Sequence, residues 1–341
     1  MIDLRSDTVT RPSPAMLEAM FRSKVGDDVF GEDPTINLLQ EKVAELFGQE
    51  AALFCPSGTM CNQISVKTHT QPLDEIILDK TAHIYLYETG GFAFHSGVSV
   101  RTVNSPNGIM TAEMVEENIQ PDFDWLPRTK LVSLENTSNK GGGTCYDLEN
   151  IRAIKKVCKR NSLKLHLDGA RIFNAIVAKG YTAKEIGQTV DSITVSFSKG
   201  LGAPVGSVLA GGKDFIAEAR RIRKVMGGGM RQAGYLAAAG LYALKHNIKR
   251  LEEDHRHARQ IADVLNEAKW VSSVIDPETN ILIFEVDENK TSVAKVLDYL
   301  KEKDILGVQF GKNQIRLVTH LDVSADMIGK VCSALMKFKF S

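Results

Sequence analysis

Short apolar runs alternate with longer amphipathic stretches along the chain as far as residue 210. The runs have the length of buried strands, and the stretches between them have the length and spacing of helices. We expect strands at residues 51–54, 75–78, 98–103, 130–134, 164–167, 192–195 and 207–210, and helices at residues 37–47, 60–68 and 148–160. This alternation predicts an α/β fold with a mostly parallel central sheet and helices on both faces.

The pattern changes after residue 233. Residues 233–268 have a continuous helical pattern, rich first in alanine and then in charged residues. Shorter elements follow at residues 280–286, 292–303, 314–318 and 325–338. We therefore expect a large domain over residues 1–245 and a smaller C-terminal α+β domain over residues 246–341, bridged by one long helix.

Charge and cysteine content narrow the classes of partner. The 42 basic and 42 acidic residues cancel, which gives no electrostatic reason to expect nucleic acid or a membrane surface as a partner. The five cysteines are scattered without a C-x-x-C string, which disfavours a disulfide framework and a zinc knuckle. The sequence predicts no metal ligands, and it leaves open whether an ion occupies a structural site. Charged residues from Asp3 onward and the lack of a long apolar run favour a cytoplasmic protein.

Two polar residues follow predicted strands. Asp168 stands in H-L-D-G-A-R after the strand at 164–167, and Lys199 stands in S-F-S-K-G-L-G after the strand at 192–195. Ligands of open α/β sheets bind beyond the carboxyl ends of the strands, so we expect both side chains at one site. A Lys amine can hold pyridoxal 5'-phosphate (PLP) as a Schiff base, and an Asp can pair with its pyridinium nitrogen. The plainer alternative is a solvated Lys and a helix-capping Asp.

A phosphate group needs backbone N–H donors at the start of a helix. Ser57, Gly58 and Thr59 lie between the strand at 51–54 and the helix expected from residue 60. They form the expected phosphate site of a PLP enzyme, although Ser-Gly-Thr is also a common turn and helix cap.

Histidines and arginines supply further candidates. His83 follows the strand at 75–78, where its ring could stack on the cofactor or act as acid or base. Arg171 and Arg316 carry planar, permanently charged groups that suit a carboxylate, although each could instead form a surface salt bridge. We expect His166 to pack in the core, and the histidines at 255 and 257 to be solvated.

Several longer strings resemble those of the L-threonine aldolases, which are PLP enzymes of the aspartate-aminotransferase-like fold (fold type I). The resemblance runs over the whole chain. Its strings are I-D-L-R-S-D-T-V-T-R-P-S, V-G-D-D-V-F-G-E-D-P-T, S-L-E-N-T, H-L-D-G-A-R-I-F-N-A, S-K-G-L-G-A-P-V-G-S, G-G-G-M-R-Q and I-R-L-V-T-H-L-D-V.

The resemblance implies a carbon–carbon lyase of threonine catabolism and glycine biosynthesis. It would cleave L-threonine, L-allo-threonine and related β-hydroxy-α-amino acids to glycine and an aldehyde. The implied catalytic residues are Lys199, His83 and Asp168. The implied cofactor ligands are Ser57, Gly58, Thr59, His83, Asp168, Arg171, Lys199 and Arg231, the last from a neighbouring subunit. The implied substrate ligands are Ser6, Arg171 and Arg316.

The resemblance also implies a homotetramer, built as a dimer of dimers that share active sites, with the N-terminal segment of about 15 residues contributing to the site. The chain departs from the family on the substrate side. Some members carry a His near position 125 or after the Glu-Asn-Thr string, where this chain has Phe123-Asp124-Trp125 and Ser138. Tyr87 occupies a position where aromatic residues and His vary in the family.

These departures leave open the preference at Cβ and the identity of the base, for which His83 or an ordered water is the candidate. Three other functions also remain open. A β-eliminating lyase would release pyruvate and ammonia from serine or cysteine. A serine hydroxymethyltransferase-like enzyme would need a folate site, which the sequence does not reveal. A PLP-free structural homologue would bind no cofactor.

Overall fold

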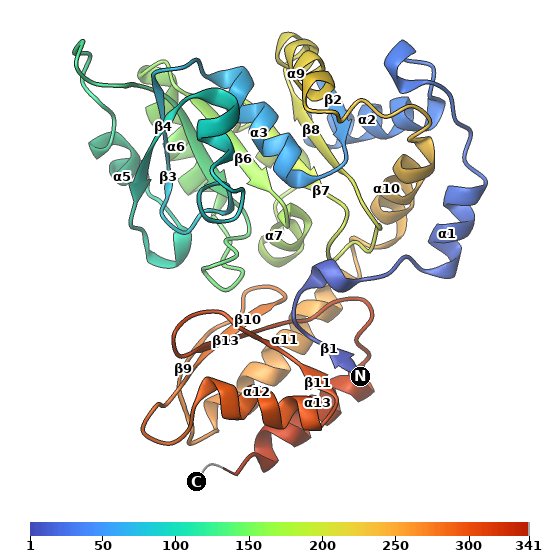
Figure 1. Cartoon of the computed structure of the whole chain (residues 1–341), viewed down its shortest axis with the longest axis vertical. Helices are drawn as coiled ribbons and strands as arrows, with labels where there is room; N and C mark the ends of the chain where they lie inside the picture. Colours follow the sequence, from blue (N-terminus) through green and yellow to red (C-terminus); the bar gives the residue numbers. More distant parts are fainter. Residues whose placement is uncertain (340–341) are drawn as a thin grey trace.

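A seven-stranded sheet forms the centre of the larger of two domains (Figure 1). The structure is a computed structural model that describes residues 1–339. The strand order is β2 (Ala51–Cys55), β8 (Ser207–Gly211), β7 (Ser192–Ser196), β6 (Lys164–Gly169), β5 (Arg128–Glu135), β3 (Asp74–Asp79) and β4 (Ser99–Val103). β8 runs antiparallel to both of its neighbours, and the other strands run parallel to one another. Each strand predicted in this region forms, with ends that differ by one or two residues.

Helices cover both faces of this sheet because both faces of its strands are apolar. α2 (Pro34–Phe47), α6 (Leu148–Arg160) and α10 (Gly234–His246) share one core with alternate strand residues such as Ile77 and Val132. α3 (Gly58–His69) and α9 (Lys213–Val225) pack on the other face, against residues such as Leu53 and Leu209. The prediction of an α/β fold with a mostly parallel sheet and helices on both faces is confirmed.

Shorter helices complete the large domain. They are α1 (Pro14–Phe21), α4 (His83–Leu86), α5 (Ala112–Glu117), α7 (Ile172–Lys179) and α8 (Ala183–Gly187). None of the helices within residues 1–339 is long and apolar enough to cross a membrane.

The prediction of one long helix over residues 233–268 is wrong. It is divided into α10 and α11 (Leu251–Asn266) by residues 247–250. Asn247 ends α10, and its side-chain amide donates a hydrogen bond to the carbonyl oxygen of Leu201 at 2.8 Å. The break lets α10 pack in the large-domain core while the second half of α11 packs in the small domain.

The small domain is an antiparallel sheet covered by helices. Its strand order is β12 (Val308–Gln309), β13 (Gln314–Val318), β10 (Ile281–Val286) and β9 (Val271–Ile275), and its helices are α11, α12 (Val293–Glu302) and α13 (Ala325–Lys337). The N-terminal strand β1 (Ile2–Asp3) pairs in parallel with β11 (Ile305–Leu306). Ile2 and Leu4 are buried in the small-domain core, so the first residues of the chain pack with its last hundred (Figure 1).

Two histidines of α11 correct another expectation. His255 and His257 are 2% and 1% exposed, not solvated. His255 lies against α7 and is hydrogen-bonded through Nε2 to the side-chain oxygen of Asn174 at 3.0 Å. The charged residues of α11 suggested an exposed helix, but the helix lies between the two domains and therefore buries more of its surface.

Gly187 offers a test of the packing between α2 and α8. A Cβ at this position would overlap the carbonyl group of Phe47, which ends α2. We expect Gly187→Ala to lower the free energy of unfolding by about 1–3 kcal/mol, since the backbone must shift to admit the methyl group. Urea unfolding followed by circular dichroism measures the change.

Gly329→Ala is the matched control. Gly329 lies in α13, is exposed, and has no neighbouring atom within 4 Å of the added methyl group among the described residues. This substitution should stabilise the protein by up to about 1 kcal/mol, because alanine favours the helix more than glycine does. Equal effects of the two substitutions would contradict the packing argument.

Candidate active site

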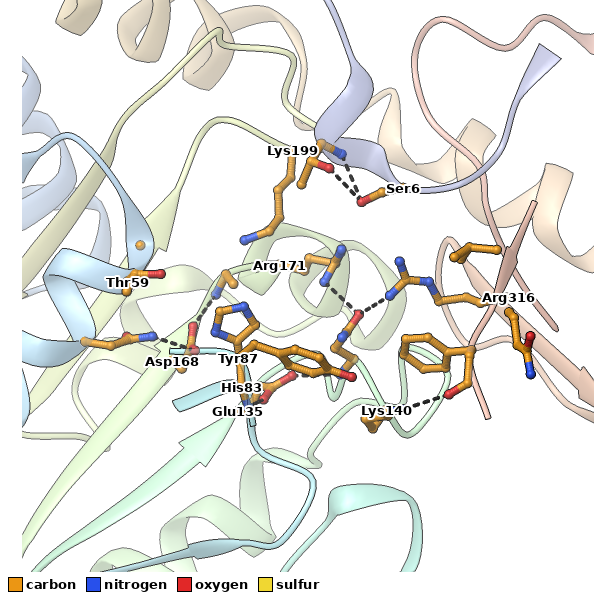
Figure 2. A pocket seen from close by; sticks show the side chains of 18 residues that line it. Ser6, Thr59, His83, Tyr87, Glu135, Lys140, Asp168, Arg171, Lys199 and Arg316 are labelled. Carbon is orange, nitrogen blue, oxygen red and sulfur yellow. Dashed lines mark hydrogen bonds between the residues drawn. The ribbon is translucent and has the colours of Figure 1, made fainter. Parts of the chain in front are cut away.

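A pocket of about 530 Å³ lies where the large-domain sheet meets the small domain (Figure 2). It is formed at the carboxyl ends of β5, β6 and β7, as expected for an open α/β sheet. Its lining comprises Ser6, Thr8, Gly58, Thr59, Asn62, His83, Tyr87, Glu135, Asn139, Lys140, Asp168, Ala170, Arg171, Lys199, Val308, Gln309, Phe310 and Arg316. Most of the predicted site residues are therefore brought together in one place.

Asp168 provides a buried negative charge at the end of β6, where it is 2% exposed. Its Oδ2 accepts a hydrogen bond from the amide of Asn62 at 2.8 Å, and its Oδ1 accepts one from the backbone N–H of Ala170 at 3.0 Å. Both donors are neutral. Asp168 therefore keeps its charge available for a cationic group in the pocket.

Lys199 stands three residues beyond the end of β7, and its amine points into the pocket (Figure 2). Burial lowers the pKa of this amine, and the neighbouring guanidinium of Arg171 lowers the pKa further. A lowered pKa makes the neutral, nucleophilic amine more accessible. Thr10 fixes the backbone here by donating its hydroxyl hydrogen to the carbonyl oxygen of Lys199 at 3.0 Å.

The helix α3 begins at the edge of the pocket. Ser57 caps the helix by accepting a hydrogen bond from the backbone N–H of Met60 at 3.2 Å, while Gly58 and Thr59 line the pocket itself. The first N–H groups of a helix lack partners within the helix and attract anions. A Cβ on Gly58 would lie 2.9 Å from the hydroxyl oxygen of Ser196, so glycine permits the close packing at this helix start.

These three features fit PLP. The start of α3 suits its phosphate, Asp168 suits its pyridinium nitrogen, and the amine of Lys199 suits its aldehyde. The fit rests on donors and charges that the fold places around one cavity.

His83 is the first residue of α4, and its ring is held from one side. Nδ1 lies 2.9 Å from a carboxylate oxygen of Glu88, which leaves Nε2 as the second functional atom of the ring. Burial lowers the pKa of His83, but the hydrogen bond to Glu88 and the charges of Asp168 and Glu135 outweigh burial, and the net shift is upward. The raised pKa favours the protonated ring, and an imidazole can act as acid or base.

Glu88 and Asn62 are functional candidates that the sequence did not reveal. Glu88 is 4% exposed, and its carboxylate accepts hydrogen bonds from the amides of Asn62 at 2.9 Å and Gln63 at 2.5 Å. Ligand atoms of His83, Glu88 and Asp168 lie within 4.8 Å of one another, and the Asn62 amide bridges the two carboxylates. No local pattern identifies Glu88, because it lies in the irregular turn that follows the four-residue helix α4.

Glu135 was also missed, although its place at the end of β5 is the kind of position that identified Asp168. Its carboxylate accepts hydrogen bonds from the backbone N–H groups of His83 at 2.6 Å and Asn139 at 2.8 Å. Burial, together with the charge of Asp168, raises the pKa of Glu135 to about 7. This residue joins two segments that carry pocket side chains.

Two arginines make the other side of the pocket positive. Arg171 donates to Asp7 through Nε at 2.8 Å and through Nη2 at 2.7 Å, in a buried ion pair rather than a surface one. The side-chain oxygen of Asn139 accepts hydrogen bonds from Arg316 at 3.0 Å and from Arg171 at 3.5 Å. Burial and the charge of Arg171 lower the pKa of Arg316 to about 10. Two cations held this close favour an anionic ligand such as a carboxylate.

Of the two remaining predicted residues, Ser6 lies at the pocket and Arg231 does not. Ser6 lines the pocket and caps a short 3₁₀ turn by accepting a hydrogen bond from the N–H of Thr8. Arg231 lies outside the pocket of its own chain and is paired with Asp27 at 3.0 Å, its side chain about half exposed. Its role toward a neighbouring subunit stays a prediction.

Comparison with known proteins adds independent information. Residues 3–289 match the family described as beta-eliminating lyase. A low specificity L-threonine aldolase of Escherichia coli (strain K12) is 47% identical over 334 residues, which cover 98% of each chain. A low-specificity L-threonine aldolase of Arabidopsis thaliana is 43% identical and is aligned over 95% of this chain and 92% of its own.

A solved structure gives the same fold. The threonine aldolase of Leishmania major superposes with a TM-score of 0.85, with 98% of each chain covered and 22% sequence identity. Both domains of the present structure therefore lie within the similarity.

The ion pair of Asp7 and Arg171 leads to a stability prediction. Asp7 is fully buried, so Asp7→Asn would leave Arg171 without its counter-ion and should cost about 3–5 kcal/mol at neutral pH. Burial alone would raise the pKa of Asp7, but Arg171 outweighs it and lowers the pKa to about 2 from an ordinary 3.8. The contribution of Asp7 is therefore present above pH 3.8 and is lost as the pH falls toward 2.

Urea unfolding at neutral pH and at a series of acid pH values measures this difference. The gap between the parent protein and Asp7→Asn should narrow through the acid range, because the variant has no carboxylate to protonate. Asp298→Asn, on an exposed position of α12, is the control and should be nearly neutral. A gap that stays constant with pH would contradict the assignment.

Proposed function

Because the chain belongs to the beta-eliminating lyase family and, within it, to the L-threonine aldolases, we propose that it cleaves L-threonine and L-allo-threonine to glycine and acetaldehyde with PLP as cofactor. One observation carries the proposal: a lysine amine and a buried carboxylate face the pocket on one side, and two arginines face it on the other. The first pair suits the cofactor, and the second suits the carboxylate of an amino acid.

The large domain would hold the cofactor. Lys199 would bond it covalently, Asp168 would pair with its ring nitrogen, and Gly58 and Thr59 would bind its phosphate, with Ser57 shaping the helix start. When bound, PLP supplies an electron sink for the pair released as the Cα–Cβ bond breaks. Asp168 supports that chemistry because its only direct hydrogen-bond donors among the described residues are neutral.

The substrate carboxylate would bind to Arg171 and Arg316, with Ser6 beside them. Asn139 accepts hydrogen bonds from both guanidinium groups and so fixes their relative position. A carboxylate held by two rigid cations leaves the amino acid little rotational freedom, which directs its Cα–Cβ bond.

His83 would remove the proton from the β-hydroxyl group. Its Nδ1 is held by Glu88, so Nε2 is the atom left to accept the proton. The same imidazole would contact the face of the cofactor ring. The relatives from Escherichia coli and Arabidopsis thaliana are low-specificity L-threonine aldolases, which supports activity on both isomers at Cβ.

The assembly and compartment belong to the same proposal. A homotetramer whose subunits share active sites would bring Arg231 of one subunit toward the phosphate site of another, and the exposure of Arg231 in the single chain is consistent with this. A reducing cytoplasmic compartment suits the five free, buried cysteines. The domain boundary near residue 245 is also proposed, with the first residues joined to the small domain.

The first test is aldehyde release from L-threonine and L-allo-threonine by the PLP-loaded protein, measured by coupled reduction of acetaldehyde. We expect both isomers to yield aldehyde and an equal amount of glycine. Lys199→Ala should lose at least roughly a thousandfold in kcat, because no other residue replaces a covalent catalytic group.

The family description favours one alternative, β-elimination, which releases pyruvate and ammonia from serine. The same protein is therefore assayed for pyruvate. A yellow, PLP-loaded protein that releases pyruvate but no aldehyde would overturn the aldolase and support the eliminating lyase. A colourless protein after incubation with PLP would exclude both.

The pH dependence of the reaction tests His83 as the base. The base must be neutral to accept a proton, so kcat/KM should fall on the acid side with the pKa of His83. Glu88 raises this pKa. We therefore expect Glu88→Gln, which keeps the shape but removes the charge, to move the acid limb to lower pH. The pH profile of kcat/KM for L-threonine measures the shift.

His83→Phe is the companion variant, because it keeps a flat ring without a proton acceptor. It should lower kcat by about a hundredfold or more while the cofactor stays bound. An unchanged kcat in this variant, with weaker cofactor binding, would mean that His83 only stacks and that water is the base.

A further inference from the structure

A continuous line of polar side chains runs from Asp168 away from the pocket and through the interior. Asn62 contacts Asp168 and also lies 3.3 Å from Nε2 of His166. Nδ1 of His166 lies 2.9 Å from the hydroxyl oxygens of both Ser65 and Ser192. Apart from Asp168, each of these residues is 1% exposed or less. The proposed catalytic steps use none of them.

The secondary structure explains why these residues meet. Asn62 and Ser65 are three positions apart in α3 and so share the face of the helix that lies on the sheet. His166 and Ser192 are direct neighbours in the β6–β7 register, and His166 points to the same side of β6 as Asp168 two residues later. His166 thus packs in the interior as expected, but among hydrogen-bonding groups rather than apolar ones.

The line ends near the surface. Nε2 of His69, in the last turn of α3, lies 2.8 Å from the hydroxyl oxygen of Ser192. The ring of His69 is stacked on Phe215 with centroids 4.4 Å apart. His69 is partly exposed and is therefore the last residue of the line, between the buried side chains and the surface.

The hydrogen-bond directions are fixed by the carboxylates. Asn62 donates from its amide nitrogen to Glu88 and to Asp168, which can only accept. Its oxygen therefore faces His166, and Nε2 of His166 must be the donor. Nδ1 is then the acceptor for a hydroxyl hydrogen of Ser65 or Ser192. Burial lowers the pKa of His166 to about 4, which agrees with a neutral ring in this single tautomer.

We propose that Asn62 and His166 are positioning residues of the reaction, which hold the carboxylate of Asp168 in the orientation that pairs with the cofactor's ring nitrogen. The two serines act one step further away by fixing the tautomer of His166. The inference rests on the proposed function, since it concerns the PLP site of the aldolase.

The orientation of Asp168 depends on the charged and polar groups that compete for its carboxylate. Asp168 lies in the interior beside Glu88, and an unrestrained carboxylate there would turn toward any available donor. Asn62 occupies one oxygen of each acid with a neutral donor, which keeps them apart without neutralising either. If the amide turned over, its oxygen would face two carboxylates, and His166 opposes this by donating to that oxygen.

The test compares His166→Leu with His166→Gln in the PLP-loaded protein. The side-chain nitrogen of glutamine can replace Nε2 as donor to Asn62, whereas leucine cannot donate. We expect His166→Leu to lower kcat for L-threonine about tenfold with KM within about twofold, as one lost positioning hydrogen bond implies, and His166→Gln to stay within about twofold of the parent.

A spectroscopic readout separates positioning from stability. PLP labelled with ¹⁵N at its ring nitrogen is bound to each variant, and the ¹⁵N chemical shift reports the protonation of that atom. The shift should move toward the unprotonated value in His166→Leu and stay at the parent value in His166→Gln. Thermal unfolding of each variant is recorded beside it.

A second pair of variants tests the same inference without a leucine at position 166, which could prevent folding. Ser65→Ala leaves Ser192 to donate to Nδ1 and should behave as the parent does. The double variant Ser65→Ala/Ser192→Ala removes both donors, frees the tautomer, and should move kcat and the ¹⁵N shift in the same direction as His166→Leu. If His166→Leu does not fold, this pair decides the question.

Two results would overturn the inference. One is an unchanged ¹⁵N shift and an unchanged kcat in the double variant. The other is a loss of kcat that follows the loss of thermal stability and is not restored by His166→Gln, which would make the line structural only. Failure of the proposed function is distinguishable, because the parent protein itself would then bind no PLP or release no aldehyde.

Discussion

The buried ion pair between Asp7 and Arg171 is the interaction on which the geometry of the site depends. Asp7 follows β1, which pairs with the small domain, and Arg171 follows β6 in the large-domain sheet. Asn280, beside β10 of the small domain, donates a hydrogen bond to the same carboxylate at 3.2 Å. One buried carboxylate thus connects the N-terminal segment, the sheet and the small domain. Because both charges are buried, the loss of either one would leave the other without a counter-ion in the protein interior, which is strongly unfavourable.

Three further acids lie around the same cavity, and each is held differently. Asp168 and Glu88 share the amide of Asn62, whereas Glu135 accepts two backbone N–H groups. Burial and the charge of Asp168 raise the pKa of Glu135 to about 7, although its two backbone hydrogen bonds act in the opposite direction. Asp168 has neutral donors, whereas Glu88 is also paired with Nδ1 of His83. The pocket therefore has Asp168 and Glu135 on the side of the sheet and Arg316 on the side of the small domain.

The sequence was sufficient for the parts of the fold that depend on local pattern. Strand-end positions identified Asp168 and Lys199, because a strand of period two followed by a loop fixes where a side chain points. Glu135 had the same signal and could have been found. Glu88 and Asn139 could not, because both lie in turns, where the sequence has no period that predicts the direction of a side chain. The division of residues 233–268 into two helices was missed because α10 packs in the large-domain core and the second half of α11 in the small-domain core, which local propensity does not encode.

The direction of the Arg316 side chain follows from the alternation of residues in β13, whereas its contacts do not. In β13, Ile315 and Leu317 point into the small-domain core, so Arg316 between them points out of it, toward the pocket. Arg316 pairs with Ile283 of β10, and this register fixes its position along the strand. A slip of one residue would bury the guanidinium and expose two apolar side chains, and the small-domain core therefore enforces the direction of Arg316. The alternation of apolar and polar residues in β13 could be recognised in the sequence. The position of the Arg316 guanidinium could not, because only its contact with Asn139 of the large domain places it beside Arg171.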